Sequence, residues 1–118
     1  MGCPVVHFEI IARDRAAVLD YYERLFGWTV APDSPQGYSI FAREDTGIQG
    51  GVAQGPAGYG GHVTVYVQVA DAEAALAKAE ALGAARMMGP MEVSPGLVVG
   101  LFTDPAGHVV GVMEPVSP

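Results

Sequence analysis

The stretch VVHFEIIARDRAAVLDYYERLFGW, residues 5–28, decides the fold of this chain. Its opening segment, residues 5–12, is rich in valine and isoleucine, which is typical of a strand. Asp14 then offers a helix N-cap, a helical pattern continues to Phe26, and Gly27 can close the helix in the left-handed conformation. The stretch therefore predicts a strand followed directly by a capped helix.

The same order recurs in HVTVYVQVADAEAALAKAEALGA, residues 62–84, with a candidate N-cap at Asp71 and a closing glycine at Gly83. A repeated strand–helix unit predicts an internal duplication. Each helix has an apolar stripe that we expect to face a core. The stripes are Val18, Tyr22, Leu25 and Phe26 in the first helix, and Ala72, Leu76, Ala79 and Leu82 in the second.

Strand patterns follow the helix in both halves, so the predicted order is β-α-β-β-β twice. The predicted later strands are 28–30, 38–42 and 48–53 in the first half, and 85–88, 97–102 and 109–114 in the second. Turns are expected at 45–47 and 104–107. We predict one α+β domain over residues 1–118, with module 1 at about 4–54, a glycine-rich linker at 55–61 and module 2 at about 62–115.

Composition excludes several classes of protein. With 50% hydrophobic and 16% charged residues, the chain is globular, and no apolar run reaches the roughly 18 residues of a membrane-spanning helix. Six basic against thirteen acidic residues give a net charge of −7, which disfavours nucleic acid and favours a neutral or cationic ligand. A single cysteine, Cys3, excludes an intramolecular disulfide and a cysteine zinc cluster. No leader pattern opens the sequence, so a cytoplasmic location is expected.

On the two repeated stretches and on LFTDPAGHVVGVMEP, residues 101–115, the chain resembles the vicinal oxygen chelate superfamily. That superfamily includes glyoxalases, extradiol dioxygenases and bleomycin-resistance proteins. The resemblance covers nearly the whole chain, and the Asp-Pro-x-Gly-His turn is its most specific piece. It implies a glyoxalase-like fold, in which two βαβββ modules form a curled mixed sheet around a shared cleft with helices outside. Because dimers are common in the superfamily, we also expect this chain to form a homodimer.

Alternation along the strands predicts which side chains face that cleft. On the strand 62–69 the valines at 63, 65, 67 and 69 form an apolar face that we expect to pack beneath helices, whereas His62, Thr64, Tyr66 and Gln68 form the polar face. On the strand 5–12 the polar face carries His7 and Glu9. Because the two strands are repeat equivalents, we expect both polar faces to look into the same cavity.

The resemblance also implies a divalent metal, held by His, Glu or Gln on the first and last strands of each module. The spacing places the four ligand positions at His7, Gly51, Thr64 and Gly111, and only His7 is a good ligand among them. As a substitute, His62 lies about 6.6 Å along the strand from Thr64. Glu114 is expected to point to the opposite face from Gly111. We therefore predict no cofactor, with a divalent metal kept as the alternative. The two glycines either give a ligand close access or allow a bend or close module packing.

Three hypotheses remain open at this point. The leading one is a small-molecule binding protein that uses the shared cleft without the usual metal. The second is a lyase, isomerase or dioxygenase, acting through His7 and displaced metal ligands or by metal-free acid–base chemistry at Glu9 or His7. The third is a dimeric interaction domain. The candidate catalytic residues are His7 and Glu9, and the candidate ligand-binding residues are Trp28, Gly51, Thr64, Tyr66, Gln68, Gly111 and Met113.

Overall fold

The computed structural model describes residues 2–116, and its chain divides into two compact units. The N-terminal unit is His7–Thr64; the C-terminal unit runs from Val65 onward and includes the residues before His7. Each unit holds one copy of the predicted repeat. Within residues 2–116, no helix is both long enough and apolar enough to span a membrane.

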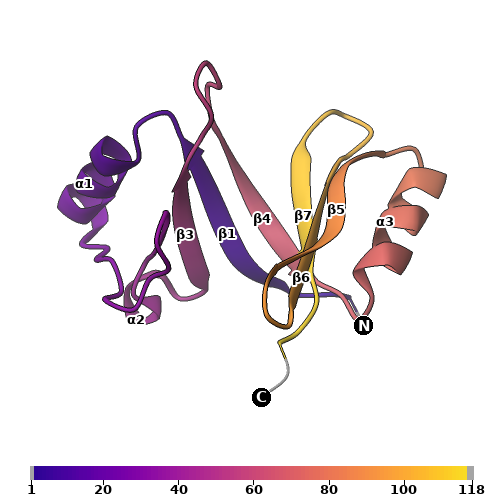
Figure 1. The fold of residues 1–118 in the computed structure, drawn as a ribbon, viewed down its shortest axis with the longest axis horizontal. Coiled ribbons are helices and arrows are strands. Elements are labelled where there is room, and N and C mark those ends of the chain that lie inside the picture. Colours follow the sequence, from indigo (N-terminus) through magenta and orange to yellow (C-terminus); the bar gives the residue numbers. More distant parts are fainter. Residues whose placement is uncertain (1, 117–118) are drawn as a thin grey trace. The chain divides into compact units, whose positions relative to one another are not determined.

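The N-terminal unit is a small mixed sheet with two helices (Figure 1). Its elements are β1 (Val5–Ala12), α1 (Arg15–Phe26), β2 (Tyr38–Ile40), α2 (Arg43–Thr46) and β3 (Gln49–Gln54), followed by the start of β4 (His62–Gln68). Strand β3 lies between β1, to which it is parallel, and β2, to which it is antiparallel. The first and last strands of the module are therefore neighbours.

The C-terminal unit repeats this arrangement (Figure 1). After β4 come α3 (Ala72–Ala81), β5 (Ala85–Ser94), β6 (Leu97–Thr103) and β7 (Val109–Met113). Strand β4 is parallel to β7, and β6 lies antiparallel between β7 and β5. Both units thus place the first and last strands of a β-α-β module side by side in parallel, which confirms the predicted α+β duplication.

The two long helices begin and end as the sequence predicts. Asp14 accepts a hydrogen bond from the Ala17 amide at 3.1 Å, and Asp71 does the same from Ala74 at 3.0 Å. Gly27 ends α1 in the left-handed conformation, with φ at 76°. Each aspartate satisfies an amide that the first helical turn leaves without a backbone partner.

Each helix packs on its own small core. In the N-terminal unit the buried residues are Ile10, Ala12, Phe41 and Val52, with Val18, Leu19, Tyr22 and Trp28 packed against them. In the C-terminal unit Ala72 and Leu76 of α3 pack against Val112 of β7. Three members of the predicted stripes are exposed instead, namely Leu25 (54%), Phe26 (56%) and Leu82 (72%). The predicted burial is wrong at the C-terminal ends of the two helices, where Leu82 is already the C-cap of α3.

Three local predictions from the sequence need correction. The predicted strand 28–30 is reduced to one isolated bridge between Val30 and Phe41. The predicted turn 45–47 is the end of the short helix α2. The predicted strand 85–88 continues to Ser94, because β5 pairs with β6 through three register shifts that the simple alternation did not anticipate.

The apolar face of β4 also differs from the prediction. Val63 is 65% exposed and Val65 is 38% exposed, whereas Thr64 and Tyr66 on the opposite face are buried. Helix α3 contacts β5, β6 and β7, so it does not extend over these valines. The expectation that the valines lie beneath helices is therefore wrong for Val63 and Val65.

The Asp104–Gly107 turn before β7 is held by one carboxylate. Asp104 accepts hydrogen bonds from the backbone amides of Ala106 and His108, each at 2.9 Å, and from Nδ1 of His108 at 3.0 Å. The backbone bond from His108, followed by its side-chain bond, lowers the pKa of Asp104. His108 therefore supports the turn, as the sequence predicted.

Candidate functional site

His7 lies on β1 of the N-terminal unit and is one of its two buried polar residues among those the structure describes. Only 7% of its surface is exposed. Its Nδ1 atom lies 3.0 Å from Oε1 of Gln49, and its Nε2 atom lies 2.6 Å from the hydroxyl of Tyr38. Gln49 is the register partner of His7 on β3, and Tyr38 begins β2. Three neighbouring strands therefore converge on one imidazole.

These partners define the protonation state of His7. Because an amide oxygen can only accept, Nδ1 carries the proton and donates it to Gln49. Nε2 then has a lone pair and accepts from the Tyr38 hydroxyl. Burial lowers the pKa of His7, while the hydrogen bond to Gln49 and the Glu9 carboxylate oppose this shift. The imidazole is consequently neutral near pH 7.

Gly51 makes room for Tyr38. A Cβ atom at position 51 would lie 2.4 Å from Cε2, Cζ and the hydroxyl oxygen of the Tyr38 ring, far inside van der Waals contact. The ring therefore lies directly against the backbone of Gly51. The space that Gly51 leaves is filled by the side chain that reaches His7.

The donor set does not fit a divalent metal at the positions that the resemblance implies. His7 already uses both ring nitrogens in hydrogen bonds, Gly51 and Gly111 have no side chain, and a threonine hydroxyl at 64 is a poor ligand. No group of three or more His, Cys, Asp or Glu side chains able to hold a metal occurs within residues 2–116.

The predicted site residues of the C-terminal unit come together in the β4–β7 pair. Tyr66 is opposite Gly111 and Gln68 is opposite Met113. A Cβ at position 111 would lie 2.5 Å from Cδ2 and Cε2 of the Tyr66 ring. A tyrosine ring thus covers the corresponding glycine in this unit as well.

Glu114 has a structural role in the same unit. Its carboxylate accepts a hydrogen bond from the Ala72 amide at 2.8 Å, at the first turn of α3. This contact directs Glu114 toward the helix, as the alternation along the last strand predicts. The carboxylate also satisfies an amide at the positive end of that helix.

The remaining predicted residues of the N-terminal unit divide between the site and the core. Glu9 is half-buried, two residues from His7, and is the register partner of Gly51. Thr64 is buried near the end of this unit. Trp28 belongs to the core, where its ring contacts Phe8 and Phe41 at centroid distances of 5.7 Å and 5.2 Å.

Two residues of the site were not identified as such from the sequence. Neither Gln49 nor Tyr38 is among the site residues that the sequence predicts. The signal for Gln49 is its spacing, since it lies two residues before Gly51 and so on the same face of the strand. Nothing in the spacing indicates that Tyr38 reaches across Gly51 to His7.

His62, the substitute metal ligand that the sequence offers, is hydrogen-bonded elsewhere. Its Nδ1 atom is hydrogen-bonded with the Tyr59 hydroxyl at the end of the linker. Its Nε2 atom is buried and has no hydrogen-bond partner among the described residues. His62 therefore anchors the linker to the start of β4.

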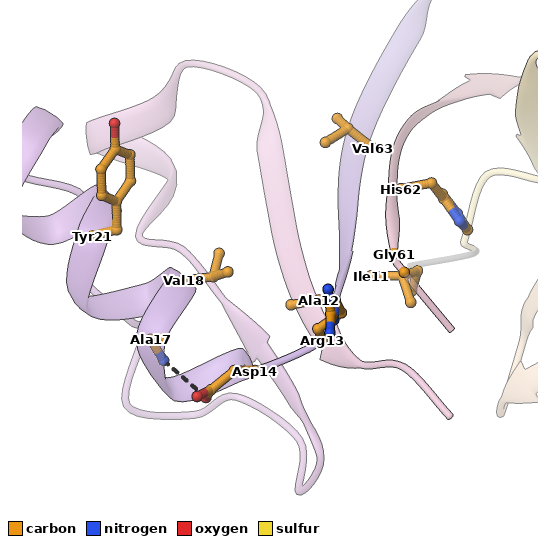
Figure 2. A pocket seen from close by; sticks show the side chains of 11 residues that line it. Ile11, Ala12, Arg13, Asp14, Ala17, Val18, Tyr21, Gly61, His62 and Val63 are labelled. Atoms are coloured by element: carbon orange, nitrogen blue, oxygen red, sulfur yellow. Dashed lines mark hydrogen bonds between the residues drawn. The ribbon is translucent and has the colours of Figure 1, made fainter. Parts of the chain in front are cut away.

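An apolar groove of about 420 Å³ lies elsewhere in the N-terminal unit, between the start of α1 and the start of β4 (Figure 2). Figure 2 shows Val18 and Tyr21 of α1 on one side and Val63 of β4 on the other. The groove is lined by neither His7 nor Tyr38. The apolar groove is therefore separate from the hydrogen-bonded cluster around His7.

Comparisons with known proteins agree with this architecture. Residues 6–113 match the family model described as a glyoxalase-like domain. The anthracycline biosynthesis protein DnrV of Streptomyces peucetius is 32% identical over 130 aligned residues, which cover 91% of this chain and 47% of that protein. This chain therefore spans about half the length of that curated relative.

Solved structures show the same fold at lower identity. Methylmalonyl-CoA epimerase of Mycobacterium tuberculosis has a TM-score of 0.68 at 14% identity, covering 97% of this chain and 88% of that one. A hypothetical protein of Bacillus halodurans has a TM-score of 0.72 at 15% identity, covering 100% of this chain and 98% of that one. At these identities the likeness establishes the fold alone.

Proposed function

Because this chain belongs to the family of glyoxalase-like domains, we propose that it binds a small organic molecule on the polar strand face that carries His7, without a divalent metal. The observation that supports this proposal is the state of His7, a buried imidazole held between Gln49 and Tyr38 where the resemblance implies a metal ligand. Such an imidazole orients the Tyr38 hydroxyl through a directional hydrogen bond and has no ring nitrogen left for coordination.

The ligand that we propose is a neutral or cationic aromatic molecule. The relative DnrV belongs to anthracycline biosynthesis by its name, and anthracyclines are fused aromatic rings that carry ketone and hydroxyl groups. The net charge of −7 attracts a cationic ligand, does not oppose a neutral one and repels the phosphates of a CoA thioester. Because Tyr38 donates its hydroxyl proton to Nε2 of His7, we propose that a ligand hydroxyl donates its proton to the Tyr38 oxygen when it binds.

Fluorescence titration tests the proposal, because anthracyclines fluoresce and lose intensity when stacked on aromatic rings. We expect saturable binding of one anthracycline per chain, and weaker binding by the Tyr38→Ala variant. Tyr21→Ala, in the separate apolar groove, is the matched control and should bind as the wild type does. Equal affinity of Tyr38→Ala and wild type, or tighter binding of methylmalonyl-CoA than of the anthracycline, would contradict the proposal.

Metal analysis of the purified wild-type protein tests the second half of the proposal. We expect far less than one zinc, nickel, manganese or iron ion per chain, with anthracycline affinity unchanged by a chelator. One tightly held ion per chain, lost together with ligand binding on chelation, would overturn it.

A second candidate function is metal-free proton transfer, and the 2.6 Å contact between Tyr38 and a neutral His7 favours it. A ligand hydroxyl or carbon acid would give its proton to the Tyr38 oxygen while Tyr38 passes its own proton to Nε2 of His7. The products are an imidazolium and an anionic ligand, so charge and protons balance. Exchange of a ligand C–H for deuterium in D₂O, abolished in Tyr38→Phe, would support this function; exchange that persists in Tyr38→Phe would exclude the relay.

A further inference from the structure

We infer that Tyr38 is the specificity-determining residue of the His7 site: its ring fills the space beside Gly51 and its hydroxyl occupies Nε2 of His7, so that the site takes a neutral hydrogen-bonding ligand rather than a divalent cation. This inference rests on the proposed metal-free function. It attributes the absence of metal binding at His7 to the side chain of Tyr38.

The Tyr38 side chain occupies the volume that a side chain at position 51 would need. Two ring carbons and the hydroxyl oxygen of Tyr38 would lie 2.4 Å from a Cβ at position 51, so the tyrosine in this position and any side chain at 51 exclude each other. A carboxylate at position 51 could approach His7 only if the ring left. The tyrosine side chain therefore fills the space that a side chain at position 51 would occupy.

The Tyr38 hydroxyl also occupies the lone pair of His7 that a metal ion would need. Gln49 accepts the Nδ1 proton, which leaves Nε2 as the atom of His7 with a lone pair. That lone pair accepts the Tyr38 hydroxyl at 2.6 Å. A cation would have to displace the phenol and break this hydrogen bond.

The C-terminal unit supplies an independent parallel. At Gly111 the ring of Tyr66 lies 2.5 Å from the position of an added Cβ. Tyr66 comes from the strand β4 paired with β7, whereas Tyr38 comes from β2, so the two rings reach their glycines from different elements. In each unit, therefore, a tyrosine ring fills the space beside a glycine, although the ring comes from a different strand of the module.

A gain-of-binding experiment tests the inference. Co²⁺, whose visible absorption reports coordination, is titrated into wild type, Gly51→Glu, Tyr38→Ala and the double variant. We expect the double variant to bind at least about tenfold more tightly than the wild type and either single variant. Binding by Gly51→Glu as tight as that of the double variant, or no gain in the double variant, would overturn the inference.

A second measurement does not require the double variant to fold. Nitrogen-15 NMR of the His7 ring reports the hydrogen bond at Nε2. Gly51→Ala adds one methyl group and should displace Tyr38, so its Nε2 signal should match that of Tyr38→Phe. Gly60→Ala is the matched control, because a Cβ there meets nothing within 4 Å. An Nε2 signal in Gly51→Ala that equals that of Gly60→Ala would show that the ring does not depend on the glycine.

The two proposals fail in different ways. A stoichiometric metal in the wild-type protein would contradict the proposed function itself. A metal-free wild type whose double variant gains no Co²⁺ affinity would contradict only the role assigned to Tyr38.

Discussion

At the residue scale, the behaviour of His7 depends on what surrounds it rather than on its position in the sequence. The imidazole is buried and has an amide oxygen on one nitrogen and a phenol on the other. A histidine at the same point of an exposed strand would titrate near its ordinary pKa and exchange its partners with water. The site is therefore a fixed, neutral hydrogen-bonding group.

The lowered pKa of His7 predicts a pH-dependent stability. Between the folded and unfolded pKa values the unfolded chain binds the proton that the folded chain does not, so the free energy of unfolding falls as the pH drops below about 6.5. The contribution is fully present above that pH. Urea unfolding of wild type and His7→Gln, from about pH 7 to pH 5, measures the difference. If the free energy of unfolding changed equally with pH in the two proteins, the prediction would be contradicted.

At the element scale, each module is organised by a strand and the helix that follows it. The N-cap aspartates, the parallel pairing of first and last strands, and the contact of each helix with its own strands recur in both units. Capping and packing are local, so their energetic consequences can be predicted for each unit by itself.

Removal of either N-cap should destabilise the chain by a similar amount. Asp14→Ala and Asp71→Ala each leave one helix amide without its partner, Ala17 or Ala74, and should lower the free energy of unfolding by about 1 kcal/mol. Asp→Asn at the same positions keeps an acceptor and serves as the control. Chemical denaturation gives the values; an alanine variant as stable as its asparagine control would argue against the caps.

The core of the C-terminal unit depends on Leu76. This side chain is fully buried, and a Cβ at Gly100 would lie 2.6 Å from its Cδ1 atom, which shows how closely β6 approaches α3. Leu76→Ala should therefore lower the free energy of unfolding by about 2–5 kcal/mol. Leu82→Ala, at a position that is 72% exposed, should change it by less than about 0.5 kcal/mol. Similar losses in both variants would contradict the placement of the core.

At the scale of the whole molecule, the described surface carries both acidic charge and exposed apolar side chains. Val63, Tyr21 and Phe26 are each more than half exposed in the single chain. The predicted homodimer would give such side chains a partner, and it remains a prediction.

Sedimentation velocity measures the oligomeric state directly. We expect a species of about twice the chain mass of 12.3 kDa at micromolar concentration, and dissociation of that species in Val63→Asp if the exposed valine lies in the interface. Glu44→Asp, a charge-conserving change on α2, is the control. A wild-type protein that sediments as a single chain at every concentration would exclude the homodimer.

The sequence by itself determined the repeat and the two capped helices, because these depend on local patterns of alternation, capping and turn residues. The glyoxalase-like fold followed from the resemblance of the repeated stretches to a known superfamily. The parallel pairing of the first and last strands of each module came only from the structure. The sequence also identified His7 and the empty side-chain positions Gly51 and Gly111. Only the tertiary structure decided that Tyr38 covers Gly51 and bonds His7, that Gln49 fixes the tautomer, and that Val63 lies exposed. Those facts depend on strand register and on the reach of side chains between strands, which no periodicity along one segment encodes.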